Sequence, residues 1–193
     1  MVKIHNLNDE IKASMLNSEY RDRTPVFGRG PVNPRIALIG EAPGADEEKQ
    51  GMPFVGKAGK NLTELLDTIG LKRDDIYITN TVKIRPTKTS PKTGKKLNRP
   101  PDKNEIAFFS PFLLKELEII EPEYIVTLGN VALNALSNKK TSIGDCHGSL
   151  TDTGLYINVF ALYHPAAIIY NQSLKETYLD DMSRLASILK SEC

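Results

Sequence analysis

Apolar and polar positions along this chain follow two patterns, one typical of strands and one typical of helices. Short, almost wholly apolar runs predict four buried strands, at residues 35–39, 76–79, 124–128 and 157–162. Helical spacing of apolar residues predicts the main helices, at about residues 7–20, 58–69, 102–120, 130–136 and 173–190. Apolar strands that alternate with helices are typical of a parallel sheet covered on both faces. We therefore expect one α/β domain over residues 1–193, with three α/β/α layers and a four-stranded parallel central sheet.

Cap and turn residues mark where several of these elements begin and end. Asp102 and Glu105 form a capping box at the start of one helix, which we expect to kink or restart at Pro111. Asn130 is the expected N-cap of the next helix. Residues 83–103 contain four prolines and show no periodicity, so they are predicted to form a loop.

Composition places the chain among ordinary globular proteins. Its 193 residues are 40% hydrophobic and 25% charged, with a formal net charge of +1. The N-terminus lacks the apolar core of a secretory signal, and no run is long enough to span a membrane. The two cysteines, Cys146 and Cys193, cannot form a disulfide framework. We therefore expect a reduced, cytoplasmic protein without a membrane partner.

The segment after the first predicted strand, residues 40–59, carries the strongest functional pattern. It reads GEAPGADEEKQGMPFVGKAG, with five glycines, two prolines and a cluster of carboxylates. A strand-to-helix loop of this kind is where α/β folds place their chemistry. Glu41 follows the strand directly, so rigid structure sets its position, and Phe54 lies where no periodicity accounts for an aromatic ring. A phosphate-binding turn is the alternative, but the spacing fits neither GxGxxG nor GxxxxGK[ST].

Two further polar residues are predicted at the same edge of the sheet. Asn80 ends the second strand, and His164 follows the fourth strand and precedes Pro165. Because the carboxyl ends of parallel strands share one edge, both side chains should approach Glu41. A side-chain amide donates and accepts hydrogen bonds together, as reading the edge of a nucleobase requires. Taken alone, each residue also has a structural reading, as a turn asparagine and as a satisfied histidine.

These stretches resemble the motifs of a known family. The pattern GEAPG-x-x-E-x-x-x-G-x-PFVG-x-AG is similar to the first motif of the uracil-DNA glycosylase superfamily, specifically its iron–sulfur branch, called family 4. The stretch TNTVKIRP from Thr79, followed by Asn98 and Arg99, and the stretch HPA from His164 resemble the later motifs in the right order. The resemblance covers about residues 13–170 and implies a pocket at the carboxyl edge of the sheet that receives a flipped base.

The resemblance also implies a role for each candidate residue. Glu41 would orient a water or support the sugar cation, and His164 would donate to the developing negative oxygen of uracil. Asn80 would read the base edge, and Phe54 would stack on its face. The further substrate-binding candidates are Gly40, Ala42, Glu47 and Asn98, with a helix cap or a surface acid as the structural alternative for Glu47. The implied protein is a monomeric, monofunctional glycosylase that removes uracil from DNA.

Basic residues between positions 83 and 103 predict contact with the DNA backbone. This stretch holds eight lysines and arginines against the single acid Asp102. Because it joins two strands of the candidate site, we expect several of its cations to contact phosphates, with a merely solvated surface as the alternative. Ile168 and Ile169 are expected to wedge into the base stack, although core packing uses the same side chains. The residues predicted to contact DNA are Lys83, Arg85, Lys95, Lys96, Arg99 and Ile168.

The chain departs from the iron–sulfur branch at two places. That branch binds its cluster through four cysteines, and the corresponding positions here hold Ala13, Leu16, Ile84 and Phe109. We therefore expect no iron–sulfur cluster and no other cofactor, and we expect these four side chains to converge in its place. A uracil-crosslinking relative carries an inserted loop that ends in a nucleophilic histidine. The matching position here is Asn98, which disfavours covalent trapping of DNA.

Three other functions stay open on the sequence. The same scaffold could excise hypoxanthine or xanthine, which a panel of single-lesion oligonucleotides would separate from uracil. A binding module could recognise uracil-DNA or a protein partner without cleaving DNA, although Glu41 and His164 argue against this. A zinc site built from Cys146, His147 and His164 is the third, and adjacent Cys and His residues are poorly spaced as ligands.

Overall fold

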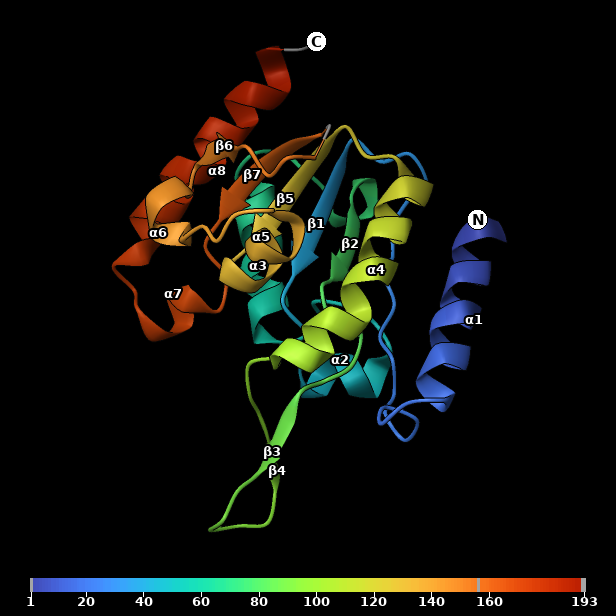
Figure 1. The fold of residues 1–193 in the computed structure, drawn as a ribbon. Coiled ribbons are helices and arrows are strands. Elements are labelled where there is room, and N and C mark those ends of the chain that lie inside the picture. Colours follow the sequence, from blue (N-terminus) through green and yellow to red (C-terminus); the bar gives the residue numbers. More distant parts are fainter. Residues whose placement is uncertain (1, 156, 192–193) are drawn as a thin grey trace.

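A mixed five-stranded sheet forms the centre of the molecule in the computed structural model, which describes residues 2–155 and 157–191 (Figure 1). The strand order is β2-β1-β5-β7-β6. The strands are β1 (Ile36–Gly40), β2 (Tyr77–Asn80), β5 (Tyr124–Leu128), β6 (Ser149–Thr151) and β7 (Asn158–Leu162). The first, second, fifth and seventh strands pair in parallel, as predicted.

Strand β6 is the addition to the predicted sheet, and it pairs with β7 in the antiparallel direction. It has only three residues, and its Leu150 is 47% exposed. A short edge strand with an exposed face leaves no apolar run in the sequence, which is why the pattern missed it. The predicted three-layer fold is confirmed, with a mostly parallel sheet of five strands in place of four.

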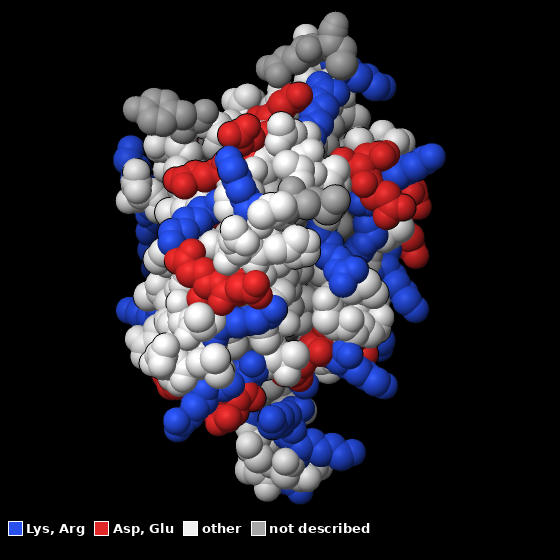
Figure 2. Space-filling view, turned by 90° about the vertical axis from the view of Figure 1, so that its right-hand side faces the viewer, with Lys and Arg blue, Asp and Glu red and all other residues white. Residues whose placement is uncertain are grey.

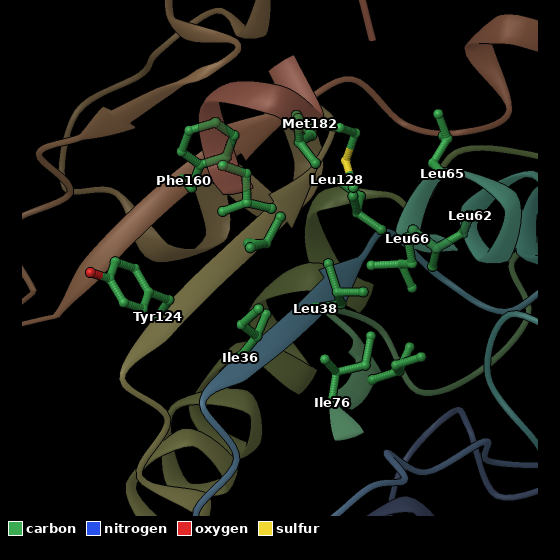
Figure 3. Packing of buried hydrophobic residues seen from close by; sticks show 14 of the residues in the cluster. Ile36, Leu38, Leu62, Leu65, Leu66, Ile76, Tyr124, Leu128, Phe160 and Met182 are labelled. Carbon is green, nitrogen blue, oxygen red and sulfur yellow. The ribbon is translucent and has the colours of Figure 1, made fainter. Parts of the chain in front are cut away.

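Helices cover both faces of this sheet. Helices α3 (Lys57–Asp67) and α8 (Leu174–Ser191) pack on one face, against Ile36 and Leu38 of β1 and their neighbours (Figure 3). Helices α4 (Lys103–Ile120) and α5 (Asn130–Leu136) pack on the other face, against Ala37 and Ile39. Successive residues of β1 therefore point to opposite layers, as strand geometry requires, and the strand is buried throughout.

The sequence predicted the N-cap of α4 correctly and that of α5 incorrectly. The capping box is confirmed, because Asp102 accepts from the backbone N–H of Glu105 at 2.9 Å and Glu105 accepts from that of Asp102 at 2.9 Å. The helix then continues through Pro111 without the expected restart. Gly129, with φ of 88°, is the N-cap of α5, and Asn130 instead accepts from the backbone of Ile143 at 2.8 Å.

The segment predicted as a loop contains a β-hairpin. Strands β3 (Thr87–Thr89) and β4 (Lys96–Asn98) pair antiparallel and project from the end of the molecule at which the strands β1, β2 and β5 finish (Figure 1). The shorter elements are α2 (Ala45–Gln50), the 3-10 helix η1 (Arg73–Asp75), α6 (Ile143–Cys146) and α7 (Ala167–Tyr170). No helix in the described part of the chain is long and apolar enough to cross a membrane.

Helix α1 (Val2–Leu16) lies outside α4 and corrects the expectation of four converging side chains. Ile84 and Phe109 are fully buried in one apolar cluster, as expected. Leu16 is 68% exposed and Ala13 is also exposed, so neither joins that cluster. Helix α1 turns Leu7, Ile11 and Met15 inward instead, because residues four apart share one helix face.

Candidate active site

The loop that follows β1 is held together by the carboxylate of Glu47. Its two oxygens accept hydrogen bonds from the backbone N–H groups of Gly44 at 3.1 Å, Val55 at 3.0 Å and Gly56 at 2.8 Å. The first bond belongs to the capping box of α2, and the last reaches the N-cap of α3. Glu47 therefore fixes the first turns of both α2 and α3. Of the two structural roles considered for it, helix cap and surface acid, the structure shows the helix cap.

The backbone of Phe54 is held in place by contacts on both of its sides. Its φ of 54° is left-handed, which a residue with a large side chain adopts only when its surroundings impose it. Arg73 of η1 donates to the carbonyl of Phe54 at 2.7 Å and also to the carbonyl of Pro53. A Cβ atom added at Gly59 would lie 1.8 Å from the Phe54 carbonyl oxygen, so only glycine allows this approach.

Asn80 lies beside Gly40 in the register of β1 and β2 and is 2% exposed. A Cβ atom at Gly40 would lie 2.4 Å from both Asn80 Oδ1 and Phe54 Cζ, so glycine lets the amide and the ring meet over the end of the strand. Among the described residues, Asn80 Oδ1 has no hydrogen-bond partner. Because an unpaired buried carbonyl is costly, this oxygen is available for an N–H donor from a ligand.

His164 follows β7 as a neutral hydrogen-bond donor. The backbone N–H of Ala166 donates to Nδ1 at 3.1 Å, so Nδ1 carries no proton and the ring proton lies on Nε2. Burial lowers the pKa of His164 to about 4, against a smaller opposing effect of Glu47. The imidazole also stacks on Phe54, with ring centroids 5.9 Å apart and an interplanar angle of 29°.

These side chains line one pocket of about 520 Å³ at the carboxyl edge of the sheet. Of the predicted substrate-binding and catalytic residues, the pocket wall contains Ala42, Glu47, Phe54, Asn80, Asn98 and His164. Gly40 and Glu41 lie directly beside that wall in the chain. Burial raises the pKa of Glu41 above its ordinary value, and its backbone carbonyl accepts from the N–H of Val82 at 3.0 Å. A pocket lined by an aromatic ring, an amide and an imidazole can accept a planar ring with hydrogen-bonding edges.

The structure corrects two of the predicted DNA contacts. Lys83 is completely buried in an ion pair with Glu116, so its ammonium cannot reach a phosphate. Ile168 is 9% exposed and packs in the core against the sheet, which makes it unavailable as a wedge. Ile169, the other wedge candidate, is 40% exposed and lines the pocket.

The remaining predicted cations fall into two groups. Lys95 and Lys96 are exposed on the hairpin. Arg85 pairs with Glu48 at 3.1 Å, and Arg99 pairs with Glu105 at 2.6 Å, so both guanidinium groups already have carboxylate partners. The contact of these four cations with DNA stays a prediction.

Tyr170 and Lys57 are two of the pocket-lining residues that sequence reasoning did not single out. Tyr170 lines the pocket and is 89% exposed, although aromatic rings are usually covered. Lys57, at the start of α3, is the other. The signal for Tyr170 was its place at the end of the apolar stretch after His164, where the ring follows two isoleucines.

The suggested zinc site does not form. In the described chain, no group of three or more His, Cys, Asp or Glu side chains could hold a metal ion. His147 instead pairs through Nδ1 with Asp181 of α8 at 2.8 Å. Cys146 is a free thiol, and Cys193 lies outside the described residues.

Many enzyme families combine a three-layer α/β/α fold with a pocket at the carboxyl edge of the sheet, and comparison with known proteins shows which family this chain belongs to. The family model of the Uracil DNA glycosylase superfamily matches residues 27–184, and the chain belongs to that superfamily. Within it, the chain is similar to the Type-4 uracil-DNA glycosylases. The protein of that name from Archaeoglobus fulgidus is 39% identical over 84% of this chain and 81% of its own length.

Two further relatives give the same result. The Type-4 uracil-DNA glycosylase of Thermotoga maritima is 40% identical over 86% of this chain and 84% of its own length. That of Saccharolobus solfataricus is 39% identical over 88% of this chain and 78% of its own. The predicted family resemblance is therefore confirmed over most of the chain.

Proposed function

We propose that this protein is a uracil-DNA glycosylase, which hydrolyses the bond between uracil and deoxyribose in DNA. Water adds to the C1′ carbon of the sugar, uracil leaves as an anion that takes up a proton, and an abasic site remains. The transition state has positive charge on the sugar and negative charge on the base. A site for this reaction needs an anion on the sugar side and hydrogen-bond donors on the base side.

The residues of the pocket meet these needs. Phe54 offers a ring face for stacking, and the buried amide of Asn80 offers an acceptor to the N3–H of uracil. The Nε2–H of neutral His164 is available to a uracil oxygen on which negative charge develops. Glu41, whose carboxylate is partly desolvated, would face the sugar and either orient the water or support the cation.

The single observation that carries this proposal is the unpaired Oδ1 of Asn80, buried in the pocket wall. A base with an N–H at the matching position, as uracil has, satisfies it, whereas the N3 acceptor of cytosine would leave both atoms unpaired. The test uses purified protein and a duplex with one deoxyuridine, read by alkaline cleavage of the abasic product. Duplexes with deoxycytidine and deoxyinosine at the same position are the controls. Release of hypoxanthine in preference to uracil would contradict the assigned specificity.

We also propose that the protein works without an iron–sulfur cluster. The positions that correspond to cluster cysteines hold Ala13, Leu16, Ile84 and Phe109, none of which can ligate iron. Ile84 and Phe109 pack instead with Tyr20, whose ring centroid lies 5.8 Å from that of Phe109. Purified protein should contain no iron and keep full activity in a chelator. Stoichiometric iron would contradict the proposal.

The proposal extends to setting and assembly. The chain would act on DNA as a monomer in the cytoplasm, consistent with its two cysteines and its lack of a predicted membrane run. Sedimentation of the free protein would measure its oligomeric state.

A further inference from the structure

The β3–β4 hairpin is anchored at its base to two helices, α2 in the pocket loop and α4 directly after the hairpin. Arg85 donates to Asn98 Oδ1 at 2.7 Å and pairs with Glu48 of α2 at 3.1 Å. Arg99 donates to the carbonyl of Thr87 at 3.2 Å and pairs with Glu105 of α4 at 2.6 Å. Because these arginines tie each strand of the hairpin to a helix, the hairpin has a set direction relative to the pocket.

The register of the hairpin assigns its side chains to two faces. Residues directly opposite each other share a face, and the pairs are Thr87 with Asn98, Lys88 with Leu97, and Thr89 with Lys96. Asn98 lines the pocket, so its face is the pocket side of the hairpin. Successive residues alternate, which puts Lys96 and Thr89 on the pocket side and Lys88 on the opposite side.

The charge of the hairpin suits a polyanion. Lys88, Lys92, Lys95 and Lys96 are all exposed, and in the described part of the chain none of them pairs with a carboxylate. Figure 2 shows basic side chains gathered on the projection at the lower end of the molecule. Lys96 stands two residues beyond Asn98, about 7 Å further from the pocket, which is the length of about two base pairs.

We propose that the pocket-side face of the hairpin, formed by Thr89 and Lys96, binds the phosphate backbone of duplex DNA on one side of the flipped nucleotide. This inference rests on the proposed function, since the pocket sets where the DNA lies. The opposite face, with Lys88 and Leu97, has no part in it. The hairpin thereby supplies a contact that the pocket itself does not provide.

The test compares Lys96→Ala with Lys88→Ala, two substitutions of the same size and charge on opposite faces. Binding is measured against salt, using a duplex with an abasic-site analogue at its centre and two duplexes cut about three base pairs from the analogue on either side. Lys96→Ala should lower the log–log salt slope by about 0.9, the value of one phosphate contact, and Lys88→Ala should leave it unchanged. Removing one particular flank should abolish the difference between the variants.

Equal salt slopes for the two variants, or a difference that survives removal of either flank, would overturn the proposal. Uracil excision is measured separately on the wild-type protein, with the same central duplex carrying deoxyuridine. If the wild-type protein excises no uracil, the proposed function fails, while the slope difference still reports on the hairpin. The two ideas can therefore fail separately.

A second inference comes from the ion pair buried beneath the pocket. The Nζ of Lys83 donates to Glu116 at 2.6 Å, to Thr79 Oγ1 at 2.7 Å and to the backbone carbonyl of Asn80 at 2.7 Å. Glu116 also accepts from Tyr77 at 2.8 Å, and it comes from α4 on one face of the sheet. Every one of these groups is buried, so the charges are compensated only by one another.

We infer that Lys83 and Glu116 are positioning residues for the amide of Asn80. A buried ion pair is poor evidence for stability, because apolar side chains often replace one without loss. This pair, however, holds the backbone at the residue whose side chain is left free for the ligand. Fixing the peptide at Asn80 limits the directions in which its side-chain amide can point. We expect this to increase the selectivity of the amide for one hydrogen-bonding edge of a base.

The test is a coupling measurement against Asn80→Ala. The double variant Lys83→Met, Glu116→Gln removes both charges and still offers an acceptor oxygen to the Tyr77 hydroxyl. Thr79→Val is a second variant, which removes a single hydroxyl group from the same network. Each should lower kcat/KM for uracil about tenfold in the wild-type background and leave it unchanged in Asn80→Ala, since contacting residues couple. Equal losses in both backgrounds from either variant that folds would show a merely structural role and overturn the inference.

Discussion

His164 and Glu41 divide the charge of the transition state between them, and each is tuned for its part by burial. A neutral imidazole with Nδ1 already bonded can only donate through Nε2. A desolvated carboxylate interacts more strongly with a nearby cation than a solvated one does. Glu41 and His164 lie just beyond the ends of β1 and β7, outside the strands themselves, so we expect both to be replaceable without loss of the fold.

We expect Glu41→Ala and His164→Ala each to lower the turnover of uracil-DNA by on the order of a hundredfold or more. The reason is that each removes a charge or a donor that acts only in the transition state. Single-turnover excision measures the effect, and thermal unfolding of both variants should match the wild type. Near-normal turnover in either variant would remove that residue from the mechanism.

The pH profile should separate the two residues. His164 has a pKa of about 4 and is neutral throughout the neutral range, so its titration should cause no change in rate from about pH 6 to pH 8. The pKa of Glu41 is raised, so activity should begin to fall, as pH decreases, above the range of an ordinary glutamate. A rate that rises as a histidine protonates near neutral pH would contradict the neutral donor. Nitrogen NMR of the imidazole gives an independent measurement of its tautomer.

At the scale of elements, the site depends on how loops are held at the ends of rigid strands. The loop after β1 owes its shape to Glu47 and Arg73, which bond to its backbone from α2 and η1. Their work is to keep Phe54 in a backbone conformation that it would not adopt alone.

We expect Arg73→Met to raise KM for uracil-DNA about tenfold with a smaller effect on kcat, because the Phe54 carbonyl loses a charged donor worth roughly 1.5–3 kcal/mol. Lys72→Met, at an exposed neighbouring position, is the matched control and should behave as the wild type. Steady-state kinetics on one deoxyuridine duplex gives both constants. In a Phe54→Ala background, Arg73→Met should have no further effect on KM, and an additive loss would argue against the clamp.

The same scale shows what the sequence can and cannot predict. The parallel strands and Glu41, Asn80 and His164 at their ends were predictable, because buried strands leave apolar runs and polar residues follow them directly. The hairpin was not, because its strands have three residues each and are exposed except at Thr87. The burial of Lys83 was not predictable either, since its partner Glu116 lies 33 positions away on another element.

Across the whole molecule, an apolar cluster joins α1, α4 and the segment after β2. Phe109 lies at its centre, fully buried and in ring contact with both Tyr20 and Phe108. Met15 and Ile11 close it from α1. Dispersion and hydrophobic burial therefore connect three segments that are far apart in the sequence.

We expect Phe109→Ala to lower the free energy of unfolding by roughly 3–5 kcal/mol, because it leaves a cavity that the surrounding rings cannot fill. Leu16→Ala, at the exposed end of α1, should stay within about 0.5 kcal/mol of the wild type. Chemical denaturation of the two variants measures both values. A large effect of Leu16→Ala would indicate that α1 packs on α4 through a different face.

The contribution of the buried ion pair between Lys83 and Glu116 to stability should also depend on temperature. The free-energy penalty for taking charges out of water falls as temperature rises, whereas hydrophobic stabilisation levels off. We therefore expect a variant with uncharged side chains at both positions to have its most favourable free energy of unfolding, relative to the wild type, at low temperature. As temperature rises, the difference in free energy of unfolding shifts in favour of the wild type. Its Lys83 then still holds the backbone carbonyl of Asn80, which limits thermal motion of the peptide beneath the base-reading amide.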